Sequence, residues 1–572
     1  MNPMAKFPCA RPGCGKHGRY SCGNCRLISY CHKHCQVADW PEHKKLCKSS
    51  LMKQDWKPSW ETENRLPPFP SPQLEENIHY RFGKETHLWG NVPAVDVLNL
   101  PHNEGSDFPH DLAILFAASG DLRNVVKTVS ELPWSFTQRI DMVLNDKEFH
   151  VVARNAILLL FCLKALEVSS TSLGRSTDAE ILTHIWYSAS LRKDIADELV
   201  LRVKPLFTEV CENVSELAAG EVSTWSWDFA HNKSLYLTLT KEQWYQIEAL
   251  CEAPSSLTLQ NASDIRTATT LAPERQDIRD RWFLKHRTPS MRLSKQKFRE
   301  HGILLPFGHD RTAFGYPNPT FYLPSSDVWP MDDRSDPLNG WPIQEVVRVQ
   351  TIATEDIYGK LYVYLRDLFE RFLSRLAQME VNFELRSAHP TELLRIFQVN
   401  KFARIDVSNI TDVSYLGTHQ TLNHLTPLLQ PPDQNPHGTI ISAYLDATLE
   451  MIHQEDDLRK VAFADFLMKY LPTSDFLALA EKNFSACVKL WDAQHLVFDR
   501  NKLFLRYINL HGFDQISAHL QVVMKDLHTV VEAWLTSLKL RPGQPGAQEE
   551  FNNLLGSNFN CTERFVEWKR AK

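Results

Sequence analysis

The sequence predicts an α/β protein in which a small N-terminal unit held by metal precedes a sheet with a large helical insertion. Three observations support this prediction. Seven of the twelve cysteines lie within residues 9–47. Short aliphatic runs alternate with helical patterns after Leu88 and again after Ala403, as the strands and helices of one sheet require. Between these regions, over about 170–398, most of the periodicity is helical.

Length and composition indicate a folded protein that works in a reducing compartment. With 572 residues, 43% hydrophobic and 10% aromatic, the chain can bury a sizeable core, and its length predicts about two to four domains. The five cysteines outside the N-terminal cluster are scattered singly. The N-terminus has no apolar signal segment, and the longest apolar run, 156–166, is too short to span a bilayer. We therefore expect a cytoplasmic or nuclear protein that is neither secreted nor membrane-bound.

Composition divides the chain into five segments. We expect a metal-stabilised unit over residues 1–50 and a flexible Trp/Pro-rich linker over 51–80, where prolines replace any helical period. The first part of a sheet domain follows over 81–168. A mainly helical insertion is expected over 169–398, and residues 399–572 return to the sheet and add C-terminal helices.

The N-terminal cysteines and one histidine are spaced as zinc ligands. The predicted sites are Cys9, Cys14, Cys31 and Cys35 for one ion and Cys22, Cys25, His43 and Cys47 for the other. Cys22-x2-Cys25 forms a tight knuckle, and His43-x3-Cys47 places two ligands one helical turn apart on one face. The ligand pairs of the two sites therefore interleave along the chain. Because four protein ligands leave no coordination position for water, both zinc ions are expected to be structural.

The segment CGNCRLISYCHKHCQVADWPEHKKLC resembles the second half of the MYND zinc-finger family, including Tyr30 before a ligand and the stretch from Gln36 to Trp40. One departure is four residues in place of two between Cys9 and Cys14, which lengthens the first knuckle. The resemblance implies that the finger binds a proline-containing peptide of a partner protein, with Gln36 and Trp40 facing that peptide. The alternative is that Trp40 packs the start of its helix.

Two strand-and-helix units begin the predicted sheet domain, with strands over 113–116 and 140–144, and strands over 403–408 and 438–444 are predicted to join the same sheet. The segments LWGNVPAVDVLNL, NEGSDFPHDLAILFAASGDLRNVVKTV and RIDVSNITDVSYLG resemble a fungal family that couples a MYND finger to a domain of unknown function. A related domain occurs in dynein axonemal assembly factors. That wider domain is similar to the class I methyltransferase fold, so the resemblance implies a Rossmann-like sheet.

Four residues are candidates for binding S-adenosylmethionine: Gly120, Asp121, Asp146 and Asn409. A strand that feeds Gly120 and a helix can present backbone N–H groups to a ligand, and Asp146 after the next strand can hydrogen-bond a ribose. Asn409 fits both a substrate-facing role and a turn-forming role. Such loops usually carry two or three glycines, whereas AASGD has only Gly120, so cofactor binding is the less favoured hypothesis. Gly120, Asp146 and Asn409 are nevertheless expected to converge at the carboxyl edge of the sheet.

Two functions of different classes follow from these observations. The favoured one is a zinc-binding adaptor or scaffold protein, and the alternative is an S-adenosylmethionine-dependent methyltransferase that uses the finger for targeting. A SET-type methyltransferase is disfavoured because the chain has no NHSC-like motif and no C-terminal cysteine cluster. Direct nucleic-acid binding is disfavoured by the net charge of −6 and by the absence of a recognition helix. The Arg/Lys-rich segment 279–299 lacks interleaved aromatic residues, which favours a solvated helix face or loop over a nucleic-acid patch.

Overall fold

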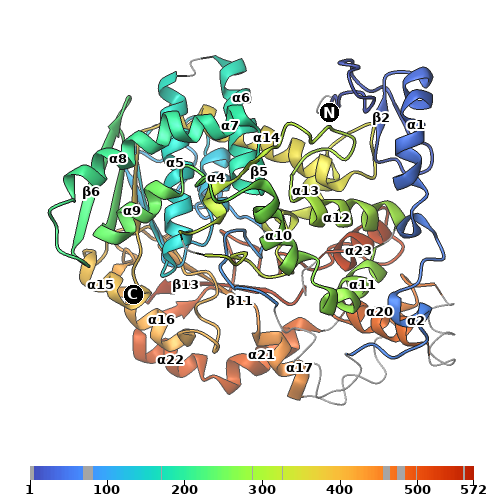
Figure 1. Cartoon of the computed structure of the whole chain (residues 1–572). Helices are drawn as coiled ribbons and strands as arrows, with labels where there is room; N and C mark the ends of the chain where they lie inside the picture. The colour runs from blue at the N-terminus through green and yellow to red at the C-terminus, as the bar shows by residue number, and fades with distance from the viewer. Residues whose placement is uncertain are drawn as a thin grey trace.

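The computed structural model describes residues 5–68, 82–168, 171–286, 288–324, 326–454, 464–472, 483–497, 499–557 and 561–571. A mixed sheet runs through the body with helices on both of its faces (Figure 1). The N-terminal finger lies at one end of the molecule and strand β6 (Val222–Phe229) at the other (Figure 1). Among the described residues, none of the helices combines the length and the apolar character that a membrane span requires.

The central sheet has nine strands among the described residues. Their spatial order is β12 (Val522–Met524), β13 (Arg564–Arg570), β11 (Thr439–Tyr444), β10 (Arg404–Asp406), β3 (Leu112–Phe116), β4 (Ile140–Asn145), β9 (Val381–Arg386), β7 (Lys233–Thr240) and β6. The strands from β11 to β7 are parallel, whereas β13 and β6 run antiparallel to their inner neighbours. The four strands predicted from the sequence correspond to β3, β4, β10 and β11. Their membership of one sheet is therefore confirmed.

Strand β3 shows how the sheet separates two apolar cores. Leu112, Ile114 and Phe116 pack into the larger core, while Ala113 and Leu115 pack into the smaller one. Successive side chains of a strand point to opposite faces, so a strand covered on both faces is apolar throughout. The larger core includes helices α4 (Arg123–Glu131), α5 (Phe149–Val168), α6 (Ser172–Tyr187) and α14 (Ile357–Leu376). The smaller core includes α15 (Leu393–Ile396), α16 (Gly417–Leu425), α21 (Arg500–Leu510) and α22 (Phe513–Leu520).

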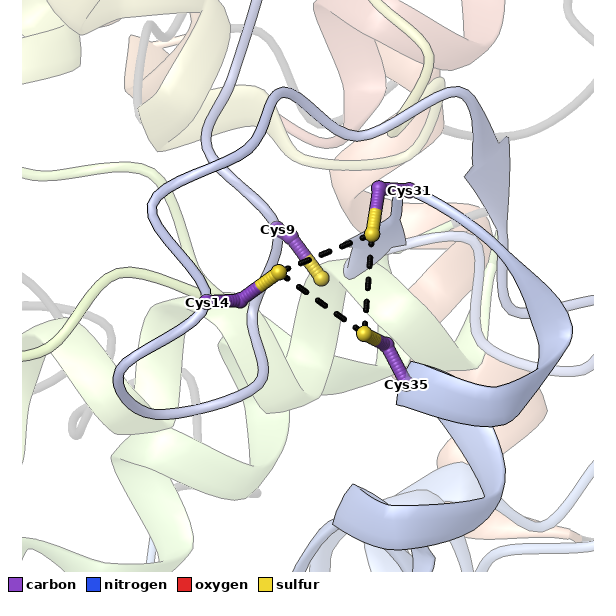
Figure 2. A group of neighbouring side chains, drawn as sticks. All are labelled: Cys9, Cys14, Cys31 and Cys35. Atoms are coloured by element: carbon purple, nitrogen blue, oxygen red, sulfur yellow. Dashed lines mark hydrogen bonds between the residues drawn. The ribbon is translucent and has the colours of Figure 1, made fainter.

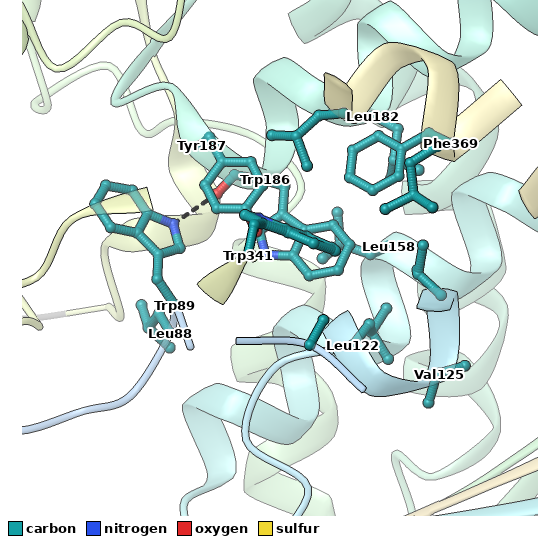
Figure 3. Packing of buried hydrophobic residues seen from close by; sticks show 14 of the residues in the cluster. Leu88, Trp89, Leu122, Val125, Leu158, Leu182, Trp186, Tyr187, Trp341 and Phe369 are labelled. Carbon is teal, nitrogen blue, oxygen red and sulfur yellow. Dashed lines mark hydrogen bonds between the residues drawn. The ribbon is translucent and has the colours of Figure 1, made fainter. Parts of the chain in front are cut away.

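Aromatic stacking fixes the helices of the larger core (Figure 3). The Trp186 ring stacks on Tyr187 and on Phe369, in each case with ring centroids 5.4 Å apart. Trp341 donates its indole N–H to the Tyr187 hydroxyl at 3.0 Å, and Trp89 donates to the Trp186 carbonyl at 2.8 Å. These contacts join α6 and α14 to the chain segment that enters the sheet domain at Leu88.

The segment predicted as a mainly helical insertion, 169–398, also supplies three strands of the sheet. Strands β6 and β7 form a hairpin whose turn residues, His231 and Asn232, both have positive φ angles of 62° and 52°. Such angles suit the tight turns that join twisted antiparallel strands. The insertion therefore widens the sheet through β9, β7 and β6. Its other helices include α7 (Lys193–Glu198), α8 (Lys204–Asn213), α9 (Lys241–Ala249), α10 (Leu259–Thr270), α11 (Gln276–Leu284), α12 (Pro289–His301) and α13 (Ile343–Val347).

The described residues of the Arg/Lys-rich segment 279–299 are buried or half-buried, so the prediction of a solvated helix face or loop is wrong. Arg279 and Arg299 donate to the carbonyls of Ala272 and Asp333 at 2.6 and 2.8 Å, and each arginine is less than one-tenth exposed. A planar guanidinium carries five N–H donors, so it can be buried where backbone carbonyls accept them. These arginines join the loops around α11 and α12.

The predicted flexible linker, 51–80, packs along the body over the part that is described. Ser59 donates its N–H and hydroxyl to Asp280 at 2.7 and 2.5 Å, and Arg65 makes a two-pronged ion pair with Asp277. The Trp60 ring is fully buried. The described part of the predicted linker is therefore bound to the body and is not a free tether. Residues 69–80 of the predicted linker lie outside the described residues. The remaining elements of this region and of the C-terminal part include η1 (Ser50–Met52), α2 (Ser59–Thr62), α17 (Ala447–Gln454), α18 (Ala464–Leu467), α20 (Phe484–Gln494) and α23 (Ala547–Leu555).

Candidate metal centre

Four cysteine sulfurs meet in the first ligand group of the finger (Figure 2). Cys9 and Cys14 come from the loop before strand β1 (Tyr20–Ser21), Cys31 follows β2 (Ser29–Tyr30), and Cys35 lies in the first turn of α1 (Lys33–Cys47). The Cys14 sulfur lies 3.6 Å from that of Cys31 and 3.7 Å from that of Cys35. The Cys31 and Cys35 sulfurs are 3.5 Å apart. Two loops and one helix end thus supply this group.

The second ligand group consists of Cys22, Cys25, His43 and Cys47, all of which are buried. Cys22 follows β1 directly, and Cys25 closes the knuckle that leads into β2. His43 and Cys47 lie one turn apart on α1, as their spacing predicts. The Cys22 and Cys47 sulfurs are 3.8 Å apart, and the Cys25 sulfur lies 3.6 Å from Nε2 of His43.

These separations fit tetrahedral zinc. Zinc–sulfur bonds of about 2.3 Å and zinc–nitrogen bonds of about 2.0–2.1 Å place neighbouring ligand atoms roughly 3.5–3.8 Å apart. A disulfide would bring two sulfurs to about 2.05 Å, far closer than any pair given above. Each group therefore has the donor set and size of a closed structural zinc site. The structure gathers the same two groups of four that the interleaved spacing predicts.

Hydrogen bonds around the ligands hold the finger in this geometry. The Tyr30 hydroxyl donates to Asp39 at 2.6 Å and joins β2 to α1. Burial and the neighbouring Asp39 carboxylate raise the pKa of Tyr30, so its hydroxyl remains a donor. Asn24 donates to the carbonyl of Cys47 at 3.0 Å and to its sulfur at 3.1 Å. A backbone hydrogen bond from Lys16 lowers the pKa of the Cys14 thiol to about 7, whereas burial raises the pKa of the Cys9 and Cys31 thiols in the same group.

The knuckle of the second group attaches the finger to the body. Ser290 in the first turn of α12 donates its hydroxyl to the Cys25 carbonyl at 2.6 Å, and the Glu355 N–H donates to the Arg26 carbonyl at 3.2 Å. The buried apolar contacts across this boundary are made by Leu27, Ile28, Leu293 and Phe307. Neither Ser290 nor Glu355 belongs to a motif that signals such a contact, so both escape prediction from the sequence.

The residues predicted to face a peptide lie on α1, outside both ligand groups. Gln36 and Trp40 are half-buried. The Trp40 ring meets the His43 ring edge-on, with centroids 5.7 Å apart, so Trp40 packs against a zinc ligand and keeps part of its surface exposed. Tyr20 and Val37, also in the finger, are 64% and 62% exposed. Helix α1 lies at the outer edge of the molecule (Figure 1).

Two of the predicted cofactor-binding residues come together at the carboxyl edge of the sheet. The Gly120 N–H donates to Asp146 at 3.0 Å, across the ends of β3 and β4. Asp121 accepts the N–H of Gly90 at 2.8 Å and an N–H of Arg123 at 2.7 Å. Asn409 follows the carboxyl end of β10, which lies at the same edge because β10 runs parallel to β3, and it donates to Asp412 in its own loop at 3.4 Å.

The segment 88–98 covers this edge of the sheet. The Arg123 guanidinium donates to the Val92 carbonyl at 2.9 Å, and Asn124 accepts the Val95 N–H at 3.1 Å. Asn124 also donates to Asp406 at 2.8 Å, which joins the first turn of α4 to the end of β10. Many polar groups where a nucleotide would lie in such a sheet are therefore bonded to other protein groups.

Two families match parts of the chain. Residues 9–47 match the MYND finger, and residues 88–191 match a domain of unknown function (DUF4470), which spans β3, β4, α5 and the segment over the sheet edge. No curated protein and no solved structure matches the chain. The MYND match and the two ligand groups together show a finger that binds two zinc ions. MYND fingers mediate protein–protein interaction.

Proposed function

We propose that this MYND-finger protein is an adaptor, in which the finger holds a proline-containing peptide of a partner and the body serves as scaffold. The observation that carries the proposal is the orientation of the finger. Its Cys25–Ile28 knuckle is attached to α12, while α1 lies at the outer edge with Gln36 and Trp40 half-buried (Figure 1). A rigid, partly exposed indole provides a flat apolar surface for a proline ring at little cost in conformational entropy.

The strand order supports a Rossmann-like body as part of this proposal. Without the β6–β7 hairpin, the parallel strands β9, β4, β3, β10 and β11 follow the order 3-2-1-4-5. That is the order of doubly wound nucleotide-binding sheets. We extend the proposal to the expected family, which couples the finger to a methyltransferase-like domain related to dynein axonemal assembly factors. The finger would occupy residues 1–50, and the sheet domain would be interrupted by 169–398.

A methyltransferase is the second candidate function, favoured by the same strand order. S-Adenosylmethionine would lie near Gly120, Asp121, Asp146 and Asn409, beside the ends of β3 and β4. The covering segment weighs against this candidate, because a side chain at Gly90 would come within 2.5 Å of Arg123 and Asp146 already holds the Gly120 N–H. A bound cofactor would have to replace these contacts.

Replacing Trp40 by alanine is expected to weaken peptide binding by about 30-fold, since truncation of an aromatic anchor typically costs about 2 kcal/mol or more. The zinc content should stay at two ions per chain, because all eight ligands remain. The measurement is fluorescence anisotropy against a library of proline-containing peptides, together with metal analysis. Trp134→Ala is the matched control, since Trp134 is 63% exposed on the body. Loss of zinc from the Trp40 variant, or equal weakening by both variants, would identify Trp40 as a packing residue.

Titration of the zinc-loaded chain with S-adenosylmethionine is expected to show no binding tighter than about 100 µM by calorimetry. The reason is that the polar groups at the sheet edge already bond to one another. Binding below that concentration, abolished by Asp146→Ala, would support the methyltransferase in place of the scaffold.

A further inference from the structure

One face of helix α1 presents an apolar centre with a lysine at either end. Its residues recur every three or four positions, which places them along one side of a helix. We call them the α1 stripe: Lys33, Gln36, Val37, Trp40 and Lys44. Both lysines are exposed, Val37 is 62% exposed, and Gln36 and Trp40 are half-buried. Because α1 also lies at the outer edge of the molecule, the stripe is open to a partner (Figure 1).

The acidic residues of α1 lie off the stripe and are already engaged. Asp39 accepts the Tyr30 hydroxyl at 2.6 Å, and Glu42 makes an ion pair with Lys45 at 2.6 Å. Neither lysine of the stripe has an ion pair or a side-chain hydrogen bond with a described residue. The stripe therefore offers two cations and no anion to a ligand.

The finger differs in charge from the rest of the chain. Residues 9–47 carry seven Lys and Arg against two Asp and Glu, whereas the remaining residues carry 56 against 67. Seven thiolates around two Zn²⁺ ions would add a net charge of −3 inside the finger, and Arg11 lies against one of these sulfurs, with Nη1 3.8 Å from Sγ of Cys35. The zinc-loaded finger thus keeps an excess of positive charge, which favours an anionic partner.

The spacing of the two lysines suits a short acidic peptide better than a nucleic acid. Lys33 and Lys44 are eleven residues apart, which is about 16 Å along a helix. A DNA duplex carries one phosphate charge per about 1.7 Å, and proteins that bind it typically neutralise several phosphates. The stripe has only two cations and one aromatic ring, and the acidic body would repel a long polyanion.

We propose that the α1 stripe binds an acidic peptide, in which carboxylates on both sides of a proline pair with Lys33 and Lys44. This inference rests on the adaptor function proposed above, because it specifies the partner of the same surface. An extended proline-containing peptide rises about 3.1 Å per residue, so its two acidic residues are expected about five positions apart. Trp40 is nearer to Lys44, which puts the proline about two residues from one acid and three from the other.

The test is fluorescence anisotropy of the zinc-loaded full chain with labelled peptides. The acidic probes are Glu-Ala-Leu-Pro-Ala-Glu and its reversed order Glu-Ala-Pro-Leu-Ala-Glu, since the peptide can run in either direction, and each has a counterpart with glutamine in place of both glutamates. At low salt, the better acidic peptide is expected to bind about fivefold tighter than its glutamine counterpart, as two exposed ion pairs allow. At about 0.5 M salt the difference should fall below twofold, because salt screens exposed charges.

The double variant Lys33→Gln with Lys44→Gln is expected to reduce the preference for the acidic peptide to less than twofold at low salt. Lys45→Gln with Lys57→Gln is the matched control, because it makes the same change in net charge. These two lysines lie off the stripe, and their ion-pair partners are Glu42 and Glu61 at 2.6 and 3.7 Å. The control should keep the fivefold preference, and both variants should keep two zinc ions per chain.

Equal affinity for the acidic and glutamine peptides would overturn the acidic specificity and leave the adaptor function standing. Failure of all four peptides to bind would contradict the adaptor function itself. Equal loss of the preference in both double variants would also overturn the proposal, since it would show an effect of net charge alone. A labelled 20-base-pair DNA duplex that binds more tightly than either acidic peptide, and is released by Lys33→Gln with Lys44→Gln, would assign the stripe to nucleic acid instead.

Discussion

Cys25→Ser is expected to remove zinc from the second ligand group and to release the finger from the body. Structural zinc contributes an apparent free energy of roughly 10–16 kcal/mol to finger peptides, and a segment of this size cannot fold on apolar burial alone. Both ligand groups use α1, through Cys35 in one and through His43 and Cys47 in the other. Loss of the second ion is therefore expected to weaken the first site as well. Metal analysis should find one zinc or fewer per chain.

The release of the finger has its own measurement. The Cys25 carbonyl accepts the Ser290 hydroxyl, so a disordered knuckle breaks the contact with α12. Limited proteolysis should then cut within residues 9–47 in the variant and leave the parent protein intact. Cys251→Ser is the matched control, since Cys251 is a buried cysteine outside the finger. Retention of two zinc ions by Cys25→Ser, or zinc loss from Cys251→Ser, would contradict the two-site assignment.

Arg404→Met is expected to lower the free energy of unfolding of the body by about 3–5 kcal/mol, the usual result of leaving one partner of a buried ion pair unpaired. The Arg404 and Glu104 side chains are 0% and 1% exposed and share two hydrogen bonds of 2.9 and 2.8 Å. Arg404 also donates to the carbonyls of His437 and Leu98, so one guanidinium joins β10, the turn before β11 and the covering segment. Urea unfolding followed by tryptophan fluorescence measures the change.

An exposed ion pair supplies the control for this variant. The Arg139 and Asp111 side chains are 44% and 53% exposed, and their charged atoms lie 3.4 Å apart. Arg139→Met should therefore lower the free energy of unfolding by no more than about 1 kcal/mol. The double variant Arg404→Met with Glu104→Gln is expected to recover part of the loss, because it no longer buries an unpaired carboxylate. Equal effects of Arg404→Met and Arg139→Met would contradict the importance of the buried pair.

Local chemistry explains why the zinc site is predictable from the sequence. A knuckle such as Cys22-x2-Cys25 and a helical pair such as His43-x3-Cys47 are set by coordination geometry within a few residues. The same holds for β3, whose five consecutive apolar residues indicate a strand covered on both faces. In each case the signal and the structure that it predicts occupy the same short segment.

Strands β7 and β9 show why other parts escape prediction. The alternation within Lys233–Thr240 is typical of a strand, but its place in the sheet depends on pairing with a distant segment. The Ser234 hydroxyl, for example, bonds Asn382, 148 residues further along the chain. Because the sequence on either side of the β6–β7 hairpin has helical periodicity, the pattern does not reveal that the hairpin belongs to the sheet.

The buried arginines escape prediction for a related reason. Arg292 donates to the carbonyl of Leu51, 241 residues earlier in the chain. Backbone carbonyls are present at every residue, so the sequence does not mark which of them will accept a guanidinium. The cationic residues around 279–299 thus have the composition of a solvated surface, although most of them are buried in the core.

The attachment of the finger to α12 has a consequence for the order of folding. Ser290 follows Cys25 by 265 residues, a distance that a ribosome working at about 5–20 residues per second covers in roughly 10–50 s. A newly made finger can take up zinc during that interval, but the helix that receives its knuckle does not yet exist. Leu27 and Ile28 are therefore exposed to water until α12 emerges. The nascent chain thus passes through a stage with a metal-loaded N-terminal unit and an uncovered apolar patch, which is the kind of surface that chaperones recognise.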